Sequence, residues 1–185
     1  MAENLNVGER IDGGVEMTDN GTIEKYCYDN NPANCDIYGG MYQWDEAMQH
    51  ITIEGATGIC PEGWYLPSDE EWKVLEGEAD SQYDYPDPIW DNIGWRGNDA
   101  GFHLKHTFGW LGEGNGDNAY GFGVLPGGHG FPFGHITDRM WFWSSTVTND
   151  FEAHGRDFHY ELNSVGRANY YPRSTAHAVR CLKGD

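Results

Sequence analysis

Aromatic side chains are concentrated in the middle of the chain, where regular periodicity is weakest. Flat rings on loops can stack on a sugar ring or anchor an apolar group, so they are candidate ligand contacts. They can equally hold loops together in place of regular structure, and the sequence leaves both interpretations open. The candidates are Trp90, Trp95, Trp110, Tyr120, Phe131 and Phe133.

A second group of candidate ligand contacts lies in a polar stretch near the end of the chain. Tyrosine supplies rigid contact area, and asparagine and arginine supply adaptable hydrogen bonds, a combination typical of binding surfaces. An exposed sheet edge with ordinary loops would have a similar composition. The side chains are His154, Arg156, Asp157, His159, Tyr160, Asn163, Arg167, Asn169, Tyr170, Tyr171 and Arg173.

Acidic and amide side chains gather in two short segments that could bind calcium, which prefers carboxylate and carbonyl oxygens. One segment contains Asp29, Asn30, Asn31 and Asp36. The other is a glycine-rich loop whose spacing differs from that of an EF-hand. We expect a structural calcium ion within residues 80–140, with the candidate ligands Glu113, Asn115, Asp117 and Asn118.

Catalytic chemistry has weaker support in the sequence. The pairs His103/His106 and His129/His135 each lack a nearby third ligand, whereas zinc needs three or four. No Gly-x-Ser-x-Gly elbow is present, so the many His, Asp and Ser residues do not predict a nucleophilic triad. We therefore expect no catalytic residue.

Composition limits the class of protein. The 185 residues fit one domain, and 26 glycines with 15% aromatic residues favour a loop-rich α+β or mostly β structure. A formal net charge of −19 argues against nucleic acid as a partner, because the phosphates would be repelled. That charge also suits a soluble exported protein, and no apolar run approaches the length of a membrane span.

The four cysteines indicate disulfides, because none of them forms a C-x-x-C pair typical of zinc or redox sites. Three pairings are possible, and we favour Cys27 with Cys35 and Cys60 with Cys181. The longer bridge would contribute on the order of 4 kcal/mol by restricting the unfolded chain. Disulfides indicate an oxidising compartment. The start Met-Ala-Glu-Asn-Leu-Asn lacks the features of a signal peptide, so we expect a signal or anchor outside this sequence.

Two helices are predicted to organise the first half of the chain. Ser68 and Glu71 form a capping box that starts a helix over 69–79. Trp44, Ala47, Met48 and Ile51 recur at three- and four-residue spacing, which predicts a helix over 42–51. Residues 1–22 are expected to form a flexible lead-in or an edge segment, and residues 23–185 a single domain.

Short strands are predicted on either side of a long, turn-rich region. They cover residues 22–28, 140–145, 158–162 and 176–182. Between residues 80 and 136 the sequence is dominated by glycine, proline, aspartate and asparagine, which are typical of turns. Loop regions of this length in a compact domain usually carry function.

Several segments, in order, resemble the Fibrobacter succinogenes major paralogous domain family. The resemblance covers roughly residues 23–185 and lies in Lys25–Asn30, Gly39–Met48, Gly58–Trp72, Leu125–Gly128, Trp141–Thr146 and Val179–Lys183. It implies a C-type-lectin-like fold, related to that of formylglycine-generating enzymes, in secreted or surface-anchored bacterial proteins. The tryptophans inside these segments, such as Trp72, Trp141 and Trp143, are expected to be structural.

The resemblance also bears on function, without naming a reaction. In related lectin-like proteins the late segment presents a variable ligand surface, which would correspond here to residues 151–177. The calcium-dependent sugar motifs Glu-Pro-Asn and Gln-Pro-Asp are absent, and so is a late cysteine pair that could bind copper. We expect a non-catalytic domain that binds carbohydrate or protein outside the cell; a structural module, or an enzyme related to the formylglycine-generating group, is the alternative.

Overall fold

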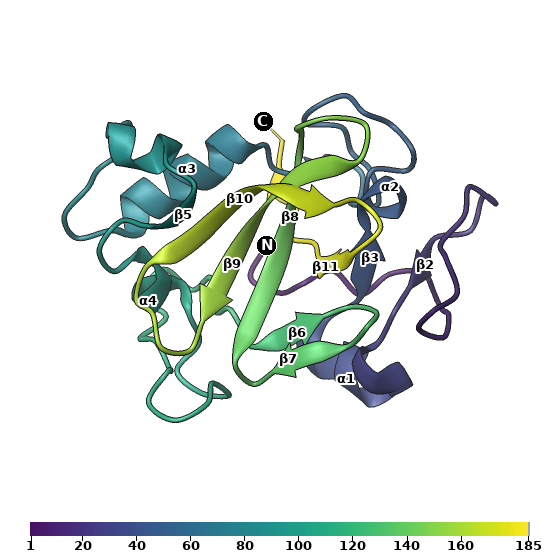
Figure 1. The fold of residues 1–185 in the computed structure, drawn as a ribbon, viewed down its shortest axis with the longest axis horizontal. Coiled ribbons are helices and arrows are strands. Elements are labelled where there is room, and N and C mark those ends of the chain that lie inside the picture. The colour runs from purple at the N-terminus through teal and green to yellow at the C-terminus, as the bar shows by residue number, and fades with distance from the viewer. Residues whose placement is uncertain (185) are drawn as a thin grey trace.

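The longest strand, β8 (Arg139–Val147), runs through the centre of an eight-stranded sheet in the computed structural model, which describes residues 1–184 (Figure 1). Most neighbours in this sheet are antiparallel, but β8 has parallel partners in β6 and β11. The order is β3 (Met41–Gln43), β11 (Ala176–Ala178), β8, β9 (Glu152–His159), β10 (Val165–Pro172) and β5 (Gly94–Arg96), with β6 (Gly127–His129) beside β8 and β7 (Gly134–Ile136) beside β6.

The helix predicted from the capping box is confirmed as α3 (Asp69–Ala79). The Ser68 hydroxyl accepts from the Glu71 amide, and the Glu71 carboxylate accepts from the Ser68 amide. This cap fixes where the helix starts, so its buried residues face the sheet. Trp72 lies against Phe142 of β8 with ring centroids 5.5 Å apart.

The other predicted helix is much shorter than expected. Tyr42 belongs to β3, and only Trp44–Ala47 form α2. Gln49 and His50 have positive φ angles of 50° and 58°, a left-handed conformation that ends the helix before Ile51.

Elements that the sequence did not predict bring the number of α-helices in residues 1–184 to four. They are α1 (Pro32–Tyr38) and α4 (Ala100–Leu104), with the 3₁₀ turns η1 (Tyr28–Asn30) and η2 (Pro88–Asp91). At α1 the signal was local, because Asn31 caps the helix and Pro32 occupies its first turn. The expected two-helix α+β structure is therefore an α+β structure with more helices and a mixed sheet.

The late strands also differ in part from the prediction. β8 covers the predicted strand 140–145, whereas β9 begins at Glu152 and ends at His159, earlier than expected. The predicted strand 176–182 is divided into β11 and β12 (Leu182–Lys183), and β10 was not predicted. Its glycine, alanine and arginine residues give no alternating apolar pattern.

The first 22 residues contact the rest of the domain along most of their length. β1 (Glu9–Arg10) pairs in parallel with β2 (Glu24–Lys25), the short remainder of the predicted strand 22–28. Leu5 is buried, and its amide donates to the carbonyl of Val179.

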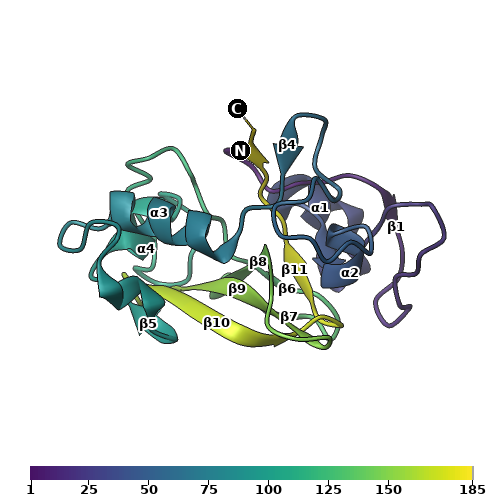
Figure 2. The same cartoon turned by 90° about the horizontal axis from the view of Figure 1, so that it is seen from above.

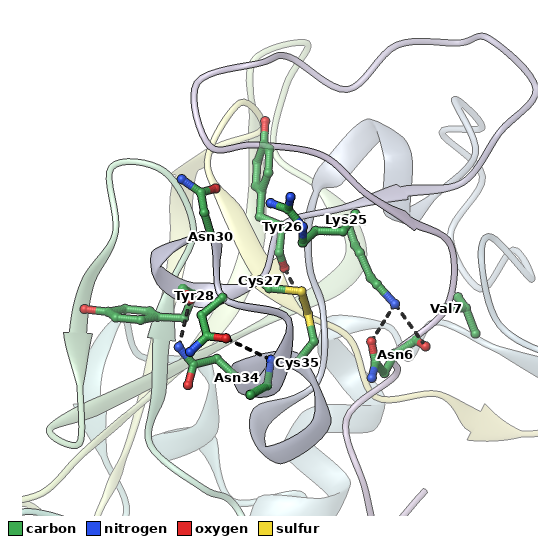
Figure 3. Close-up of a disulfide and its surroundings, with 12 residues drawn as sticks. Asn6, Val7, Lys25, Tyr26, Cys27, Tyr28, Asn30, Asn34 and Cys35 are labelled. Carbon is green, nitrogen blue, oxygen red and sulfur yellow. Dashed lines mark hydrogen bonds between the residues drawn. A yellow bond between two sulfur atoms is a disulfide. The ribbon is translucent and has the colours of Figure 1, made fainter.

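Both expected disulfides are present, Cys27–Cys35 and Cys60–Cys181. The first joins η1 to α1, where Lys25 also reaches Asn6 with a 2.7 Å hydrogen bond (Figure 3). The second joins the start of the α3 region to the last strands, close to the pairing of β4 (Trp64–Tyr65) with β12. None of the helices within residues 1–184 has the length and apolar character needed to cross a membrane.

The four α-helices lie on one side of the sheet (Figure 2). The core between helices and sheet includes Trp72, Phe142 and Phe158. Within residues 1–184, no helix covers the opposite face of β8, β9, β10 and β5 (Figure 2). We call this the open face, and the other the covered face.

Candidate functional site

A row of four residues crosses the open face from strand to strand. Trp141 pairs with Asp157, Asp157 with Gly166, and Gly166 with Trp95. Residues paired in this way project from the same face of a sheet. Neighbouring strands are about 4.8 Å apart, so the two tryptophans flank a carboxylate and a glycine over about 14 Å.

The Trp95 ring lies over Gly166 and remains accessible. Trp95 is 40% exposed, and a Cβ on Gly166 would come 3.2 Å from its ring. Any larger residue at position 166 would therefore push the ring away from the sheet. His159 meets Trp95 edge to face, with centroids 6.1 Å apart. The sequence thus provides a flat, half-exposed aromatic surface beside the Asp157 carboxyl group.

Asp157 and Arg139 form an incompletely bonded pair at the centre of the open face. Arg139 Nη1 donates to Asp157 Oδ2 at 3.2 Å, and the guanidinium lies over the Trp141 ring. Oδ1 of Asp157 and Nε of Arg139, both buried, have no hydrogen-bond partner in residues 1–184. Burial raises the pKa of the Asp157 carboxyl to about 7, although Arg139 acts in the opposite direction.

Histidine and tyrosine rings surround the Trp141 end of the row. His129 and His135 lie 5.1 Å and 5.5 Å from the Trp141 ring, and 5.7 Å from each other. Beneath them His177 is buried, and burial holds its pKa well below the usual range. Tyr171 packs edge-on against His177 at 4.9 Å. This end of the face is therefore built mainly of aromatic rings.

Arg156, predicted as a ligand contact, lies instead on the covered face and is fully buried. The strand alternation turns it toward α3, where it pairs with Asp69 and Glu76. His154 has the same orientation, with Nδ1 3.2 Å from Asp69 Oδ1, so this second prediction is also corrected. Both residues belong to the packing between α3 and the sheet.

The Asp69 carboxylate is the centre of this buried ion network. Burial alone would raise the pKa of Asp69, but the adjacent His154, hydrogen bonds from Arg167 and the charge of Arg156 outweigh it and hold the pKa well below its usual range. Glu76, also fully buried, pairs with both Arg96 and Arg156. Each charge named here has at least one opposite charge in contact.

Trp110 is another predicted contact that the structure corrects. It is 4% exposed, its Nε1 donates to the carbonyl of Val124, and the Lys105 ammonium lies over its ring. This ring holds loops together, which is the alternative that the sequence left open. Burial lowers the pKa of Lys105 to about 8.

The remaining predicted aromatic contacts are scattered, and Trp90 among them is buried in the core. Tyr120 lies near His103, Phe131 near Phe133, and Tyr160 beside His159. Tyr170 is 56% exposed. Only His159 and Tyr171, with Tyr160 at the border, join Trp95 around the row of four.

Two polar residues that were predicted as ligand contacts, Asn169 and Arg173, are bonded to other parts of the chain. The Asn169 carbonyl accepts from Thr148, and Arg173 pairs with Asp45 while stacking on Trp44. Arg173 also donates to the carbonyl of Asp150 at 3.0 Å. These contacts close the end of the sheet near α2.

The predicted calcium ligands lie in one loop, where two of them are bonded to other groups of the chain. Asn115 Oδ1 accepts from the Trp110 amide, Asp117 pairs with His103 at 2.9 Å, and Glu113 is exposed. Asn118 has a buried Oδ1 with no partner in the described chain. No group of three or more His, Cys, Asp or Glu side chains in residues 1–184 is arranged to hold a metal ion.

Comparison with known proteins places the chain in a family. A model of the Fibrobacter succinogenes major domain matches residues 1–183. The chain belongs to this family. No curated protein and no solved structure matches it. The match includes the first 22 residues, which fits their contacts with the rest of this Fibrobacter succinogenes major domain.

Sequence reasoning missed part of the open-face row. Trp141 was expected to be structural and is indeed only 7% exposed, whereas Arg139 and Gly166 were not considered as site residues. A signal exists in β8, where Arg139, Trp141 and Trp143 alternate with Met140 and Phe142. Period-two alternation predicts two faces, but the pairing with Asp157, Gly166 and Trp95 depends on strands that are distant in sequence.

Proposed function

We propose that this Fibrobacter succinogenes major domain is a non-catalytic binding module that recognises carbohydrate through its open face. The observation that carries the proposal is the row Trp141, Asp157, Gly166 and Trp95, with its exposed ring and incompletely bonded carboxyl group. We also infer a C-type-lectin-like fold from the family resemblance, the mixed sheet and the long loops.

Carbohydrate suits the chemistry of this face better than other ligands do. Sugar rings offer apolar C–H faces for stacking and hydroxyl groups that both donate and accept hydrogen bonds. One hydroxyl would donate to Asp157 Oδ1 and another would accept from Arg139 Nε, so two unsatisfied polar atoms would gain partners. The Arg139 side chain, one third exposed, would shift to admit them.

Binding without catalysis is supported by where the titratable groups lie. The raised pKa of Asp157 and the lowered pKa of His159, both due mainly to burial, belong to the open face. A cavity of about 440 Å³ elsewhere in the molecule is lined by other residues and includes neither of these two groups. A protein ligand at the same face is the alternative, since aromatic and arginine side chains also anchor protein interfaces.

An extracellular or surface location is part of the proposal. It rests on the two disulfides, which persist in oxidising compartments. Mass spectrometry under non-reducing conditions, on protein alkylated during extraction from its natural host, would show no modified cysteine. Four alkylated thiols would contradict the extracellular assignment.

A structural calcium ion in the loop of Glu113, Asn115, Asp117 and Asn118 remains a proposal as well. If it binds, calcium should raise the melting temperature, because a ligand selective for the folded state stabilises it. At a calcium concentration a hundred times Kd the gain would be about 2.7 kcal/mol. Equal melting temperatures in calcium and in chelator would contradict the proposed calcium site.

A glycan array probed with and without calcium tests the main proposal. We expect saturable binding by the folded protein, with at least a tenfold loss of affinity for Trp95→Ala. Tyr120→Ala is the matched control, because Tyr120 is similarly exposed but lies outside the row. If a well-folded sample binds no glycan, a protein ligand or a structural module is favoured. If Trp95→Ala and Tyr120→Ala lose equal affinity, the open face is not the binding site.

A further inference from the structure

A cavity of about 440 Å³ lies on the helix side of the sheet, away from the open face. It is enclosed by the N-terminal segment, α1 and the loop before β6, and its volume is within the range of small-molecule sites. Among its lining residues are Asn4, Asp36, Ile37, Asn118 and Arg180. Asp36 and Asn118 belong to the two candidate calcium-binding segments, and Asn4, Ile37 and Arg180 have no assigned role in binding.

Arg180 is the buried charge in the wall of this cavity. Its residue surface is only 4% exposed, and its guanidinium stacks on Phe122 at 4.2 Å. Nε donates to Asn4 Oδ1 at 2.7 Å, and the two terminal nitrogens donate to the carbonyls of Phe122 and Gly123. These bonds use three of the five N–H groups of a guanidinium, which leaves two for another acceptor.

All three acceptors of Arg180 are uncharged, unlike those of the other buried arginines. Arg96 and Arg156 each pair with the Glu76 carboxylate. No carboxylate in residues 1–184 lies within ion-pair distance of Arg180. Burial lowers the pKa of Arg180 to about 9, and Glu3 opposes this only through longer-range attraction. A buried charge without a counter-ion is costly unless something else compensates it.

We propose that this cavity binds a small organic carboxylate, whose anionic group pairs with Arg180. A carboxylate matches the fork of a guanidinium and supplies the charge that the protein itself does not. Glu3 and Asp36 also line the cavity, so a phosphate dianion would meet stronger repulsion than a monoanion. The ligand enters from the rim formed by α1, where Ile37 is 57% exposed.

Nuclear magnetic resonance titration of the whole chain with acetate tests the proposal directly. The probe signal is the Nε–H resonance of Arg180, followed at constant ionic strength with sodium chloride and inorganic phosphate as comparison salts. We expect a saturable shift with acetate, little change with chloride and weaker binding of phosphate. No saturable acetate shift, an equal response to chloride, or tighter binding of phosphate would each overturn the carboxylate assignment.

Variants at the rim keep the test independent of folding, because replacing Arg180 itself could disrupt the core. Ile37→Asp adds a negative charge and should weaken acetate binding about threefold. Ile37→Asn introduces a side chain of the same shape as aspartate but without the charge, and should change acetate binding little. Asp36→Asn removes a negative charge and should strengthen binding about twofold. Identical affinities in all three variants would place the bound acetate elsewhere and refute the site. Carbohydrate binding at the open face should be unaffected throughout.

Discussion

The two faces of the central sheet differ in how their buried carboxylates are bonded. On the covered face, Asp69 and Glu76 of α3 pair with Arg96, Arg156 and Arg167. On the open face, Asp157 has one oxygen bonded to Arg139 and another without any partner in the described chain. Both arrangements place carboxylates beside arginines. They differ in that both oxygens of Asp69 and of Glu76 accept hydrogen bonds from the protein, although Nε of Arg96 has no partner in residues 1–184.

This difference separates a structural role from a binding role. A network in which both oxygens of each carboxylate are bonded fixes the position of a helix on a sheet, since every charge depends on its neighbours. An incomplete one leaves free energy to be gained when an outside group supplies the missing partners. Removal of one member should therefore be harmful on the covered face and tolerated, or even favourable, on the open face.

The largest expected effect is on the covered face, at Glu76. Glu76→Gln removes the negative charge shared by Arg96 and Arg156 and should lower the free energy of unfolding by about 3–5 kcal/mol. Urea denaturation with both disulfides intact measures this change. Glu78→Gln, at an exposed position of the same helix, should stay within about 0.5 kcal/mol of the parent. Similar small losses in both variants would show that the buried network contributes little.

The second prediction concerns Asp157 and is a dependence of stability on pH. Its carboxyl has a pKa of about 7 in the folded state, above the value of about 3.9 in an unfolded chain. Between these values the folded state binds more protons, so this group makes stability fall as pH rises toward 7. Asp157→Asn removes the penalty and should stabilise the protein at pH 8 by on the order of 4 kcal/mol.

The same variant should differ little from the parent near pH 4, where Asp157 is protonated and uncharged. Thermal melts at pH 4 and pH 8 provide the comparison. Asp84→Asn, an exposed control, should give the same small difference at both pH values. If Asp157→Asn destabilises the protein more at pH 8 than at pH 4, Asp157 is a paired structural carboxylate like Asp69.

The covered face could be predicted from the sequence only in part. The capping box predicted α3 correctly because that signal lies within four consecutive residues, Ser68 to Glu71. The partners of Asp69 and Glu76 could not be predicted, since Arg156 lies 80 or more positions further along the chain. For this reason Arg156 was placed on an exposed surface when it is in fact part of the core.

The open face was harder to predict, and for a different physical reason. Gly166 and Ala168 have no apolar pattern of their own, so β10 was missed. Small residues are needed there because the Trp95 ring and Tyr171 pack over the sheet, as the close approach of Tyr171 to Gly155 also shows. Trp95, predicted as a ligand contact, has a ring that is 40% exposed, whereas Trp110 in the same turn-rich region is buried.

The smallest expected effect compares one tryptophan from each face. Trp95→Ala should lower the free energy of unfolding by only about 1 kcal/mol, because its ring is already 40% exposed and truncation leaves no closed cavity. Trp72→Ala, which removes a ring that is 2% exposed between α3 and β8, should cost about 3–5 kcal/mol. Urea denaturation of both variants measures the two losses in the free energy of unfolding. A loss at Trp95 as large as that at Trp72 would mean that the ring is held for stability, and the reason for assigning it to a ligand would disappear.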